Sequence, residues 1–303
     1  MNDTYHIACC TDNNYAQHCG VMLCSLLENN KDNHFCIHIL HTDLNNDNQR
    51  KLSSIVVENY HSEVRFYLMD EKKFTHIKMP QNTSLSIATY YRFTLGSLLS
   101  NEIKTILYLD CDLVVLRPIS DLFNLDMDNY ALAAVEDYCI VDNHHRMQLA
   151  LSYQSPYFNA GVLFINLEYW RKHSVENKLF QYIGFCKIDY FQDQDALNYV
   201  FKDKWLQLSP MWNKINMQAI KGSVFKYSSD KKEYYHNPVI IHYAWGAIKP
   251  WLNIHFLPNS AFYHTYLKKT PWAKVKVQSI KSNGIYFVLL KRFIKIFVYR
   301  FFK

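Results

Sequence analysis

Glycine is scarce in this chain of 303 residues, which contains only 7. Neither the dinucleotide-binding pattern G-x-G-x-x-G nor the phosphate-binding pattern G-x-x-x-x-G-K-[ST] occurs. The sequence therefore offers no glycine-rich loop around phosphate groups, which disfavours the nucleotide-binding folds that depend on such a loop.

Paired metal-binding cysteines and a secretion signal are also missing. The 8 cysteines include no C-x-x-C pair, and the N-terminal stretch MNDTYHIACC has neither a basic start nor a long apolar run. We therefore expect a cytoplasmic protein with reduced thiols, most of which are small core residues.

Acidic residues are absent from the C-terminal end of the chain. No Asp or Glu follows Glu233, whereas residues 268–303 are dense in lysine, arginine and aromatic residues. On a helical wheel, residues 286–303 separate an aromatic face from a basic face. We expect an amphipathic helix that lies on an anionic membrane surface, because its charges interrupt any run long enough to span a bilayer. A helix docked on the protein's own surface is the alternative.

This change in composition divides the chain into a main domain, residues 1–267, and a basic aromatic tail, residues 268–303. The formal net charge of +6 would also be compatible with nucleic-acid binding. Because the cations concentrate in an aromatic, amphipathic tail, we expect a membrane partner and no nucleic acid. The protein is then expected to be peripheral, on the inner face of the cell membrane.

Strand-like and helix-like segments alternate along the main domain. Strands are expected at residues 5–10, 34–42 and 64–70, with helices at 15–28 and 45–59 between them. This β-α-β-α-β order is typical of a parallel sheet covered by helices. Later segments predict helices at 89–100, 167–186 and 192–203, and strands at 104–116, 130–137 and 158–167. The fold class is therefore α/β, with a mixed, mainly parallel sheet.

Two carboxylates interrupt the apolar segment LYLDCDLVV, residues 107–115. In a strand, Asp110 and Asp112 would point to the same side, near the strand end at which α/β proteins bind ligands. Carboxylates held close together repel each other, and a divalent cation such as Mn²⁺, Mg²⁺ or Ca²⁺ removes that conflict. A turn with two solvated aspartates is the alternative, because D-x-D is a short motif.

Six ordered blocks carry a more specific signal. They are TDNNYA (11–16), ATYYRF (88–93), ILYLDCDLVV (106–115), FNAGVLFINL (158–167), FQDQDALN (191–198) and HYAWGAIKPW (242–251). In this order they resemble glycosyltransferase family 8, the retaining, Mn²⁺-dependent enzymes of the Rossmann-like GT-A fold that use UDP-sugars. The resemblance covers roughly residues 5–251 and is strongest to bacterial galactosyl- and glucosyltransferases of lipopolysaccharide assembly.

The resemblance implies a role for residues in each block. It implies that Asp110, Asp112 and His242 bind Mn²⁺, with Mg²⁺ as the alternative ion. It sets Asp193 and Gln194, as catalytic residues, against the sugar hydroxyls and the β-face of the anomeric carbon. The donor-binding residues that it implies are Asp12, Asn14, Tyr15, Arg92, Asp110, Cys111, Asn159, Ala160, Gly246 and Lys249.

Several of these residues also have a purely structural interpretation. Asp12 and Asp193 would cap helices, and His242 would be a core residue. The side chain of Cys111 is expected to point away from the carboxylates, toward packing. The last block also departs from the family pattern H-[FY]-x-G-x-x-K-P-W, because it has one residue more between His242 and Gly246.

The function implied by the resemblance is the retaining transfer of galactose or glucose from a UDP-hexose to a glycan or glycolipid acceptor, such as a lipopolysaccharide core. The amide of Gln194 is a poor nucleophile, which favours front-face attack by the acceptor over double displacement through Asp193. A metal-dependent nucleotidyl- or phosphoryltransferase would also need paired aspartates, but further phosphate-binding loops are missing. A non-catalytic module that binds nucleotide sugars is disfavoured by the intact acidic residues.

Overall fold

The structure, a computed structural model, describes residues 4–75, 77, 86–138, 143–152, 155–185, 191–216, 228–244, 249–252 and 257–275, together with four residues of the tail: Leu290, Lys291, Ile294 and Val298. The rest of the expected tail helix lies outside the described residues, and so does Gly246.

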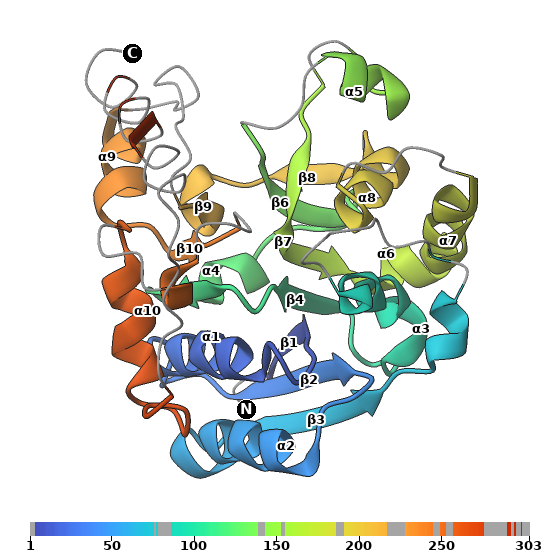
Figure 1. The fold of residues 1–303 in the computed structure, drawn as a ribbon. Coiled ribbons are helices and arrows are strands. Elements are labelled where there is room, and N and C mark those ends of the chain that lie inside the picture. Colours follow the sequence, from blue (N-terminus) through green and yellow to red (C-terminus); the bar gives the residue numbers. More distant parts are fainter. Residues whose placement is uncertain are drawn as a thin grey trace.

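A seven-stranded sheet forms the centre of the protein (Figure 1). The order is β3-β2-β1-β4-β7-β6-β8, and β7 runs antiparallel to its neighbours β4 and β6 whereas the other described pairings are parallel. The strands are β1 (Tyr5–Cys10), β2 (Phe35–His41), β3 (Glu63–Leu68), β4 (Thr105–Leu109), β6 (Leu132–Glu136), β7 (Phe158–Asn166) and β8 (Trp205–Gln207). The expected α/β class with a mixed, mainly parallel sheet is confirmed.

A second, three-stranded sheet contains β5 (Leu113–Val115), β10 (Ile240–His242) and β9 (Lys214–Ile215). The prediction of one strand over 104–116 is therefore wrong, because β4 ends at Leu109 and β5 belongs to this other sheet. The amide of Asp110 still donates to the carbonyl of Gly161 in β7, whereas the carbonyl of Asp112 already accepts from Tyr243, next to β10. The two carboxylates thus lie where the chain passes from one sheet to the other.

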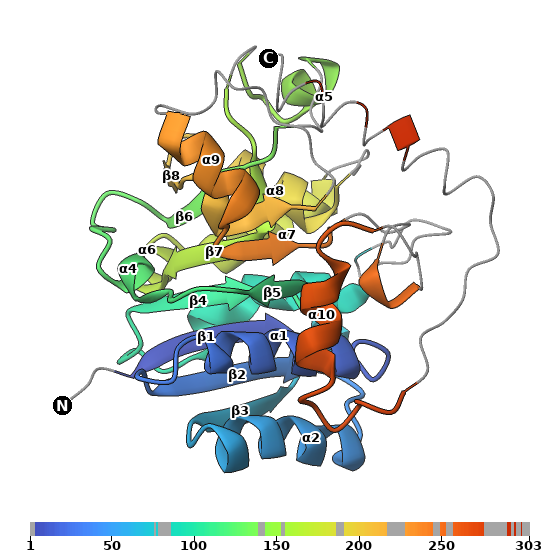
Figure 2. The ribbon, with the colours of Figure 1, turned by 90° about the vertical axis from the view of Figure 1, so that its left-hand side faces the viewer.

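Helices cover both faces of the large sheet (Figures 1 and 2). Successive strand residues alternate between these faces: Ile7 and Cys9 pack with α1, whereas Ala8 packs on the opposite side. The first face carries α1 (Ala16–Glu28), α2 (Asn46–Ser53), its π-helical continuation η1 (Ser54–Asn59) and α10 (Ser260–Leu267). The second face carries the 3-10 helix η3 (Ile87–Thr94), α3 (Leu95–Leu98), α6 (Leu167–Lys172), α7 (Val175–Phe185) and α8 (Asp193–Phe201).

The remaining helices lie at the ends of the sheets and in the connections. They are η2 (Glu71–Phe74), α4 (Ser120–Phe123), α5 (Asn143–Gln148), η4 (Pro210–Asn213), α9 (Ser228–His236) and η6 (Pro250–Leu252).

Two of the expected helices differ in form. The segment 89–100 is helical as far as Leu98, but its first half belongs to the 3-10 helix η3. The long helix expected at 167–186 is divided into α6 and α7, because Ser174 has a φ of 50°. A serine in this left-handed conformation ends one helix, and the chain starts the next in a new direction.

Helix α10 packs beside α1, as Figure 2 shows. Asn29 donates to the hydroxyl of Tyr266, and Lys269 donates to Glu28. The indole of Trp272 covers Gly20 so closely that a Cβ there would lie 2.6 Å from it. This packing continues past residue 267, where the expected domain boundary lies. Among the helices of the described chain, none is long and apolar enough to cross a membrane.

Candidate active site

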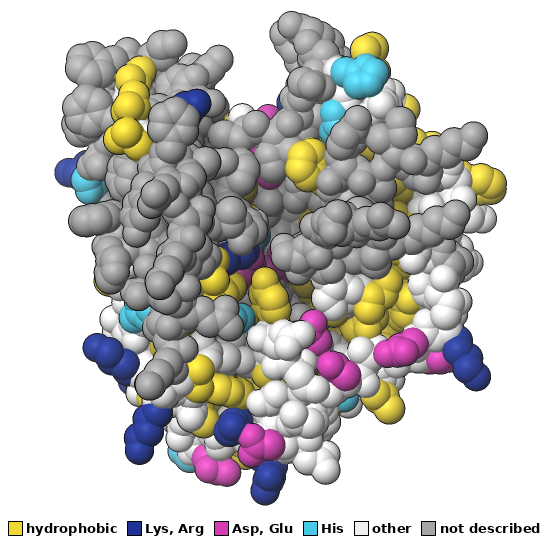
Figure 3. All heavy atoms as spheres, in the orientation of Figure 1, with side chains coloured by type: hydrophobic (Ala, Val, Ile, Leu, Met, Phe, Trp, Pro, Cys, Tyr) yellow, Lys and Arg dark blue, Asp and Glu magenta, His cyan; other side chains and the backbone are white. Residues whose placement is uncertain are grey.

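The strand order reverses between β1 and β4, because the chain places β2 and β3 on one side of β1 and returns to β4 on the other. In open α/β sheets, ligands bind beyond the carboxyl ends of strands at such a point. A cavity of about 380 Å³ lies there. Figure 3 shows acidic and basic side chains together in the hollow at the centre of this face.

This cavity brings the predicted site residues together. The predicted residues that line it are Asp12, Tyr15, Arg92, Asp110, Cys111, Asp112, Asn159, Ala160, Asp193, Gln194, His242 and Lys249. Asn14 is exposed and lies outside the lining.

Three potential metal ligands converge in the cavity. One ligand atom from each of Asp110, Asp112 and His242 lies within 4.8 Å of the other two. His242 Nε2 is 3.1 Å from Asp112 Oδ1 and 3.8 Å from Asp110 Oδ2. On its other side, His242 Nδ1 lies 3.0 Å from the side-chain oxygen of Asn213, which fixes the ring and directs Nε2 toward the carboxylates.

Gly161 has no side chain, and the side chains of the cluster occupy the space that a side chain at this position would fill. A Cβ at this position would lie 2.2 Å from Cε1 of His242 and 2.9 Å from Oδ2 of Asp110. No side chain fits at such distances, so the glycine in the FNAG block is required for the close approach of the ligands.

Lys249 completes the cluster on the Asp112 side. Its ammonium group donates to Asp112 Oδ2 at 2.5 Å and to the carbonyl of Tyr243 at 2.7 Å. Burial alone would raise the pKa of Asp112, but the charges of Lys249 and His242 overcome it and hold that pKa well below its usual range. Asp112 is therefore ionised at neutral pH.

Arg92 joins the cluster of potential metal ligands to Asp193, one of the two residues predicted to be catalytic. Its Nη2 donates to Asp110 Oδ1 at 2.9 Å, and its Nε lies 3.2 Å from Asp193 Oδ2. Nη1 donates to the carbonyl of Ala160 at 2.6 Å. Because this buried guanidinium directs all its nitrogens at protein oxygens, it orients the acidic residues.

Asp193 and Gln194 begin helix α8 and face the cavity. Gln194 Oε1 accepts from the backbone amide of Ala160 at 2.9 Å and from Asn159 Nδ2 at 3.1 Å. Asp193 Oδ1 accepts from the hydroxyl of Thr89 at 2.8 Å. Burial raises the pKa of Asp193 to about 6, although Arg92 opposes the shift. The preceding residue, Gln192, is buried with a φ of 52°, so backbone strain is stored beside this pair.

The loop after β1 forms the other wall of the cavity. Asp12 Oδ1 accepts from the amide of Tyr15 at 2.9 Å, so Asp12 also makes the capping contact that its position suggests. The ring of Tyr15 meets Trp251 edge-on at 6.0 Å between ring centres, and His18 stacks on the same indole at 3.6 Å. Tyr15 itself lines the cavity, and the contacts with Trp251 and His18 hold its ring in place.

Cys111 points away from the two carboxylates that flank it. Its thiol donates to the carbonyl of Cys10 at 3.2 Å and lies with the buried thiols of Cys9 and Cys19, within 4.8 Å of both. The side chain therefore has the packing role expected for it, although the residue borders the cavity.

Two further residues of the site, Asn213 and Asp137, lie outside the motif blocks, and a third, Thr89, stands in the block ATYYRF without a role assigned from the sequence. Thr89 binds Asp193, and Asn213 holds His242. Asp137 is 1% exposed, lines the cavity and accepts from Asn159 Nδ2 at 3.2 Å. The sequence did contain one indication that Asp137 belongs to the site: it directly follows a strand of the sheet, as Asp110 does.

The family model of "Glycosyl transferase family 8" matches residues 6–255. The chain belongs to glycosyltransferase family 8. It is 31% identical to General stress protein A of Bacillus subtilis over 280 residues, a match that covers 89% of this chain and 96% of that protein. It is 26% identical to a lipopolysaccharide 1,2-glucosyltransferase of Escherichia coli over 90% of this chain and 80% of that one.

A solved relative confirms the GT-A architecture of this family 8 chain. The galactosyltransferase LgtC, crystallised with donor and acceptor sugar analogs, superimposes with a TM-score of 0.78. The alignment covers 88% of this chain and 96% of that chain at 24% identity. This likeness extends to the fold alone, whereas membership of the family makes the protein a glycosyltransferase.

Proposed function

We propose that this protein is a retaining hexosyltransferase that uses a UDP-hexose. The observation that carries the proposal is the cluster of Asp110, Asp112, His242 and Lys249 in the same cavity as Gln194. One end of the cavity is thus built for a metal-bound diphosphate and the other for a sugar. Relatives named lipopolysaccharide 1,2-glucosyltransferase and lipopolysaccharide 1,3-galactosyltransferase support glucose or galactose as the sugar and a cell-surface glycan or glycolipid, such as a lipopolysaccharide core, as the acceptor.

The cluster fits a divalent ion, Mn²⁺ or Mg²⁺. It offers two carboxylates and an oriented imidazole nitrogen, which can lie close together because Gly161 has no side chain. When bound, the ion would supply Lewis-acid charge for the leaving diphosphate. Asp110, Asp112 and His242 would hold it, and the ammonium group of Lys249 would add a second positive charge beside the same phosphate oxygens.

The contacts of Gln194 and Asp193 favour front-face transfer with retention. Gln194 presents an amide, which is a poor nucleophile, and its Oε1 is already bound by Ala160 and Asn159. Asp193 is held by Thr89 and Arg92 rather than free to attack. The acceptor oxygen then bonds to the anomeric carbon on the side from which the phosphate oxygen leaves. UDP departs with the bonding electrons and takes the proton of the acceptor hydroxyl.

We further propose that the tail attaches the enzyme to the inner face of the cell membrane. Leu290, Ile294 and Val298 are exposed helical residues spaced four apart, so they share one side of a helix. An exposed apolar side opposite basic residues is typical of helices that lie in a membrane interface.

A donor screen tests the proposed function. The protein is incubated with Mn²⁺ and a panel of UDP-hexoses, and release of UDP and free hexose is measured. With a glycan acceptor, NMR of the product should show the anomeric configuration of the donor. Release of UMP or pyrophosphate instead would indicate a nucleotidyltransferase or pyrophosphatase. Binding of UDP-hexose without any turnover, even with acceptor, would indicate a binding module.

A further inference from the structure

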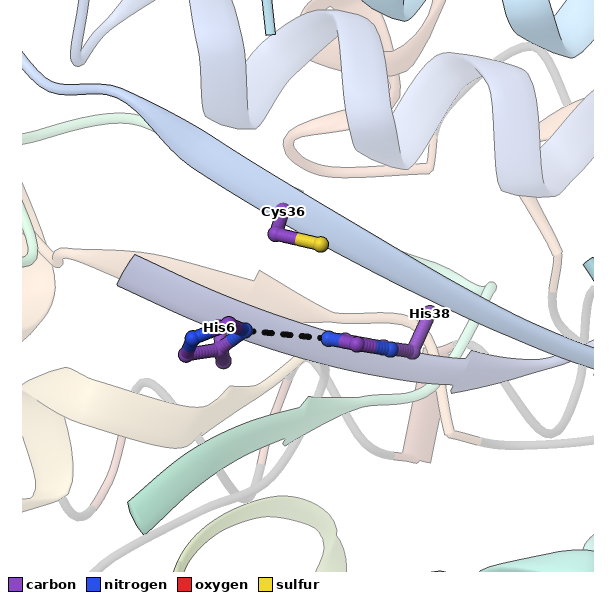
Figure 4. A group of neighbouring side chains, drawn as sticks. All are labelled: His6, Cys36 and His38. Carbon is purple, nitrogen blue, oxygen red and sulfur yellow. Dashed lines mark hydrogen bonds between the residues drawn. The ribbon is translucent and has the colours of Figure 1, made fainter. Parts of the chain in front are cut away.

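We propose that His6, Cys36 and His38 form a second metal site, which binds a borderline-soft divalent ion such as Zn²⁺ (Figure 4). The three residues belong to β1 and β2, and none of them lines the catalytic cavity. The site is separate from the carboxylate cluster. An ion bound there would stabilise the sheet and would take no part in sugar transfer.

Strand register places the three side chains on one face of the sheet. His6 and Cys36 are direct partners in the parallel pairing of β1 with β2. His38 follows Cys36 by two residues, so it points to the same side of β2. Figure 4 shows the two imidazole rings end to end, with the thiol of Cys36 beside them.

The distances between the ligand atoms suit a tetrahedral ion. His6 Nδ1 lies 3.0 Å from His38 Nε2, and one ring nitrogen of each histidine and the Cys36 sulfur all lie within 4.8 Å of one another. Tetrahedral Zn²⁺ with Zn–N bonds of about 2.0 Å would separate the two nitrogens by about 3.3 Å. The rings therefore need to open by only a few tenths of an ångström for an ion to replace their hydrogen bond.

Neighbouring groups already support these ligands. His38 Nδ1 lies 2.9 Å from the hydroxyl of Tyr67, which fixes the ring in the way that outer contacts fix metal-ligating histidines. Glu63 is the register partner of Cys36 on β3, so its carboxylate is carried on the strand next to the thiol. This carboxylate, or a water molecule, supplies the fourth ligand.

The protonation states agree with metal binding. Burial lowers the pKa of His6, and it lowers the pKa of His38 to about 3, so both imidazoles are neutral at pH 7. Burial raises the pKa of Cys36 to about 11, so an ion that binds the thiolate releases a proton. The positive charge of Arg65 opposes an incoming cation, but Arg65 is paired with Glu63 at 3.0 Å.

Cobalt is a suitable probe, because Co²⁺ bound to a thiolate gives a sulfur-to-metal charge-transfer band. Metal-free protein is saturated with Mg²⁺ to occupy the oxygen ligands of the catalytic cluster and is then titrated with Co²⁺. We expect a charge-transfer band that saturates at one ion per chain and disappears when Zn²⁺ is added. The Tm should rise with Zn²⁺, because the ion binds the folded state.

Matched variants identify the ligands. Cys36→Ser should remove the band and the Zn²⁺-dependent rise in Tm but leave UDP release unchanged. Cys19→Ser alters the other thiol cluster, formed with Cys9 and Cys111, and should leave the band intact. His6→Gln changes a half-buried ligand at the start of β1 and should weaken Co²⁺ binding by about 10-fold or more while the thiol remains.

Three results would overturn the second site. They are the absence of a charge-transfer band in the wild-type protein, a band that survives Cys36→Ser, and a band lost in Cys19→Ser. If Cys36→Ser does not fold, unchanged Co²⁺ affinity in His6→Gln would also overturn the second site.

Discussion

His242 Nε2 lies 3.1 Å from Asp112 Oδ1, although 130 residues separate them in the chain. The small sheet explains this proximity, because His242 pairs with Leu113, which directly follows Asp112. The carboxylates come from the strand break after β4, and the imidazole comes with β10. The three-stranded sheet therefore assembles the cluster of potential metal ligands at the carboxyl end of β4, the central strand of the large sheet.

Replacing Asp112 should remove both metal binding and turnover. Asp112→Asn keeps the volume but leaves one carboxylate for the ion and removes the ion pair with Lys249. We expect Mn²⁺-dependent UDP release to fall about 100-fold or more, since several kcal/mol of charge stabilisation are lost. Enzyme kinetics and an Mn²⁺ titration followed by electron paramagnetic resonance measure the two effects. Asp128→Asn, at an exposed position, is the control, and full activity in Asp112→Asn would contradict the assignment.

Gly161→Ala should damage the same cluster through sterics alone. The added methyl group would overlap with the His242 ring and crowd Asp110, so the ligands must separate. We expect weaker Mn²⁺ binding and slower UDP release. Gly184→Ala in α7 is the matched control, because a Cβ there meets nothing within 4 Å. Its Tm should stay the same or rise, since alanine favours a helix by up to about 1 kcal/mol. Equal Mn²⁺ affinity in both variants would exclude the steric role of Gly161.

Local sequence patterns predicted the first half of the sheet well. The strands expected at 5–10, 34–42 and 64–70 were found within about two residues, because each is a short apolar run bounded by turn residues. The same pattern failed at 104–116, since hydrophobicity does not show that the chain changes its pairing partner at Asp110. Pairing partners are long-range contacts, which one sequence does not reveal.

The site was predictable to the extent that its residues stand in motif blocks. Asp137 and Asn213 were missed because their roles come from tertiary contacts with Asn159 and His242. The cluster of His6, Cys36 and His38 was missed for the same reason. Only the C-x-H spacing on β2 is visible in the sequence, whereas the position of His6 depends on strand register.

Gln194→Ala should separate chemistry from donor binding. The amide lies at the end of the cavity proposed to bind the sugar, held by Ala160 and Asn159, whereas other residues form the end proposed to bind the diphosphate. We expect a lower kcat with little change in the dissociation constant for UDP. Single-turnover kinetics and UDP titration measure these quantities. Loss of UDP affinity with unchanged turnover of bound donor would place Gln194 elsewhere.

Removal of residues 276–303 should detach the protein from anionic membranes. Each cation of the tail that lies near the membrane surface would contribute about 1 kcal/mol. Trp272 remains packed against Gly20 in the shortened chain, so the Tm should not fall. Co-sedimentation with anionic vesicles measures binding, and neutral vesicles are the control. A shortened chain that binds anionic vesicles as strongly as the full chain would refute the role of the tail.

Asp193 should make stability depend on pH. Burial raises its pKa in the folded protein from 3.8 to about 6, despite the nearby charge of Arg92. The folded state then binds this proton more tightly than the unfolded state, so its contribution to stability is full below about pH 4 and declines as the pH rises to about 6. The expected loss is about 3 kcal/mol.

Asp193→Asn, which mimics the neutral acid, isolates this effect. The free energy of unfolding of the variant, relative to that of the wild type, should increase by about 2.4 kcal/mol between pH 4 and pH 7. Urea unfolding at several pH values measures the difference. Asp128→Asn, which changes an exposed carboxylate, should show a nearly constant difference. A constant difference for Asp193→Asn as well would mean that Asp193 ionises normally and that Arg92 fully offsets its burial.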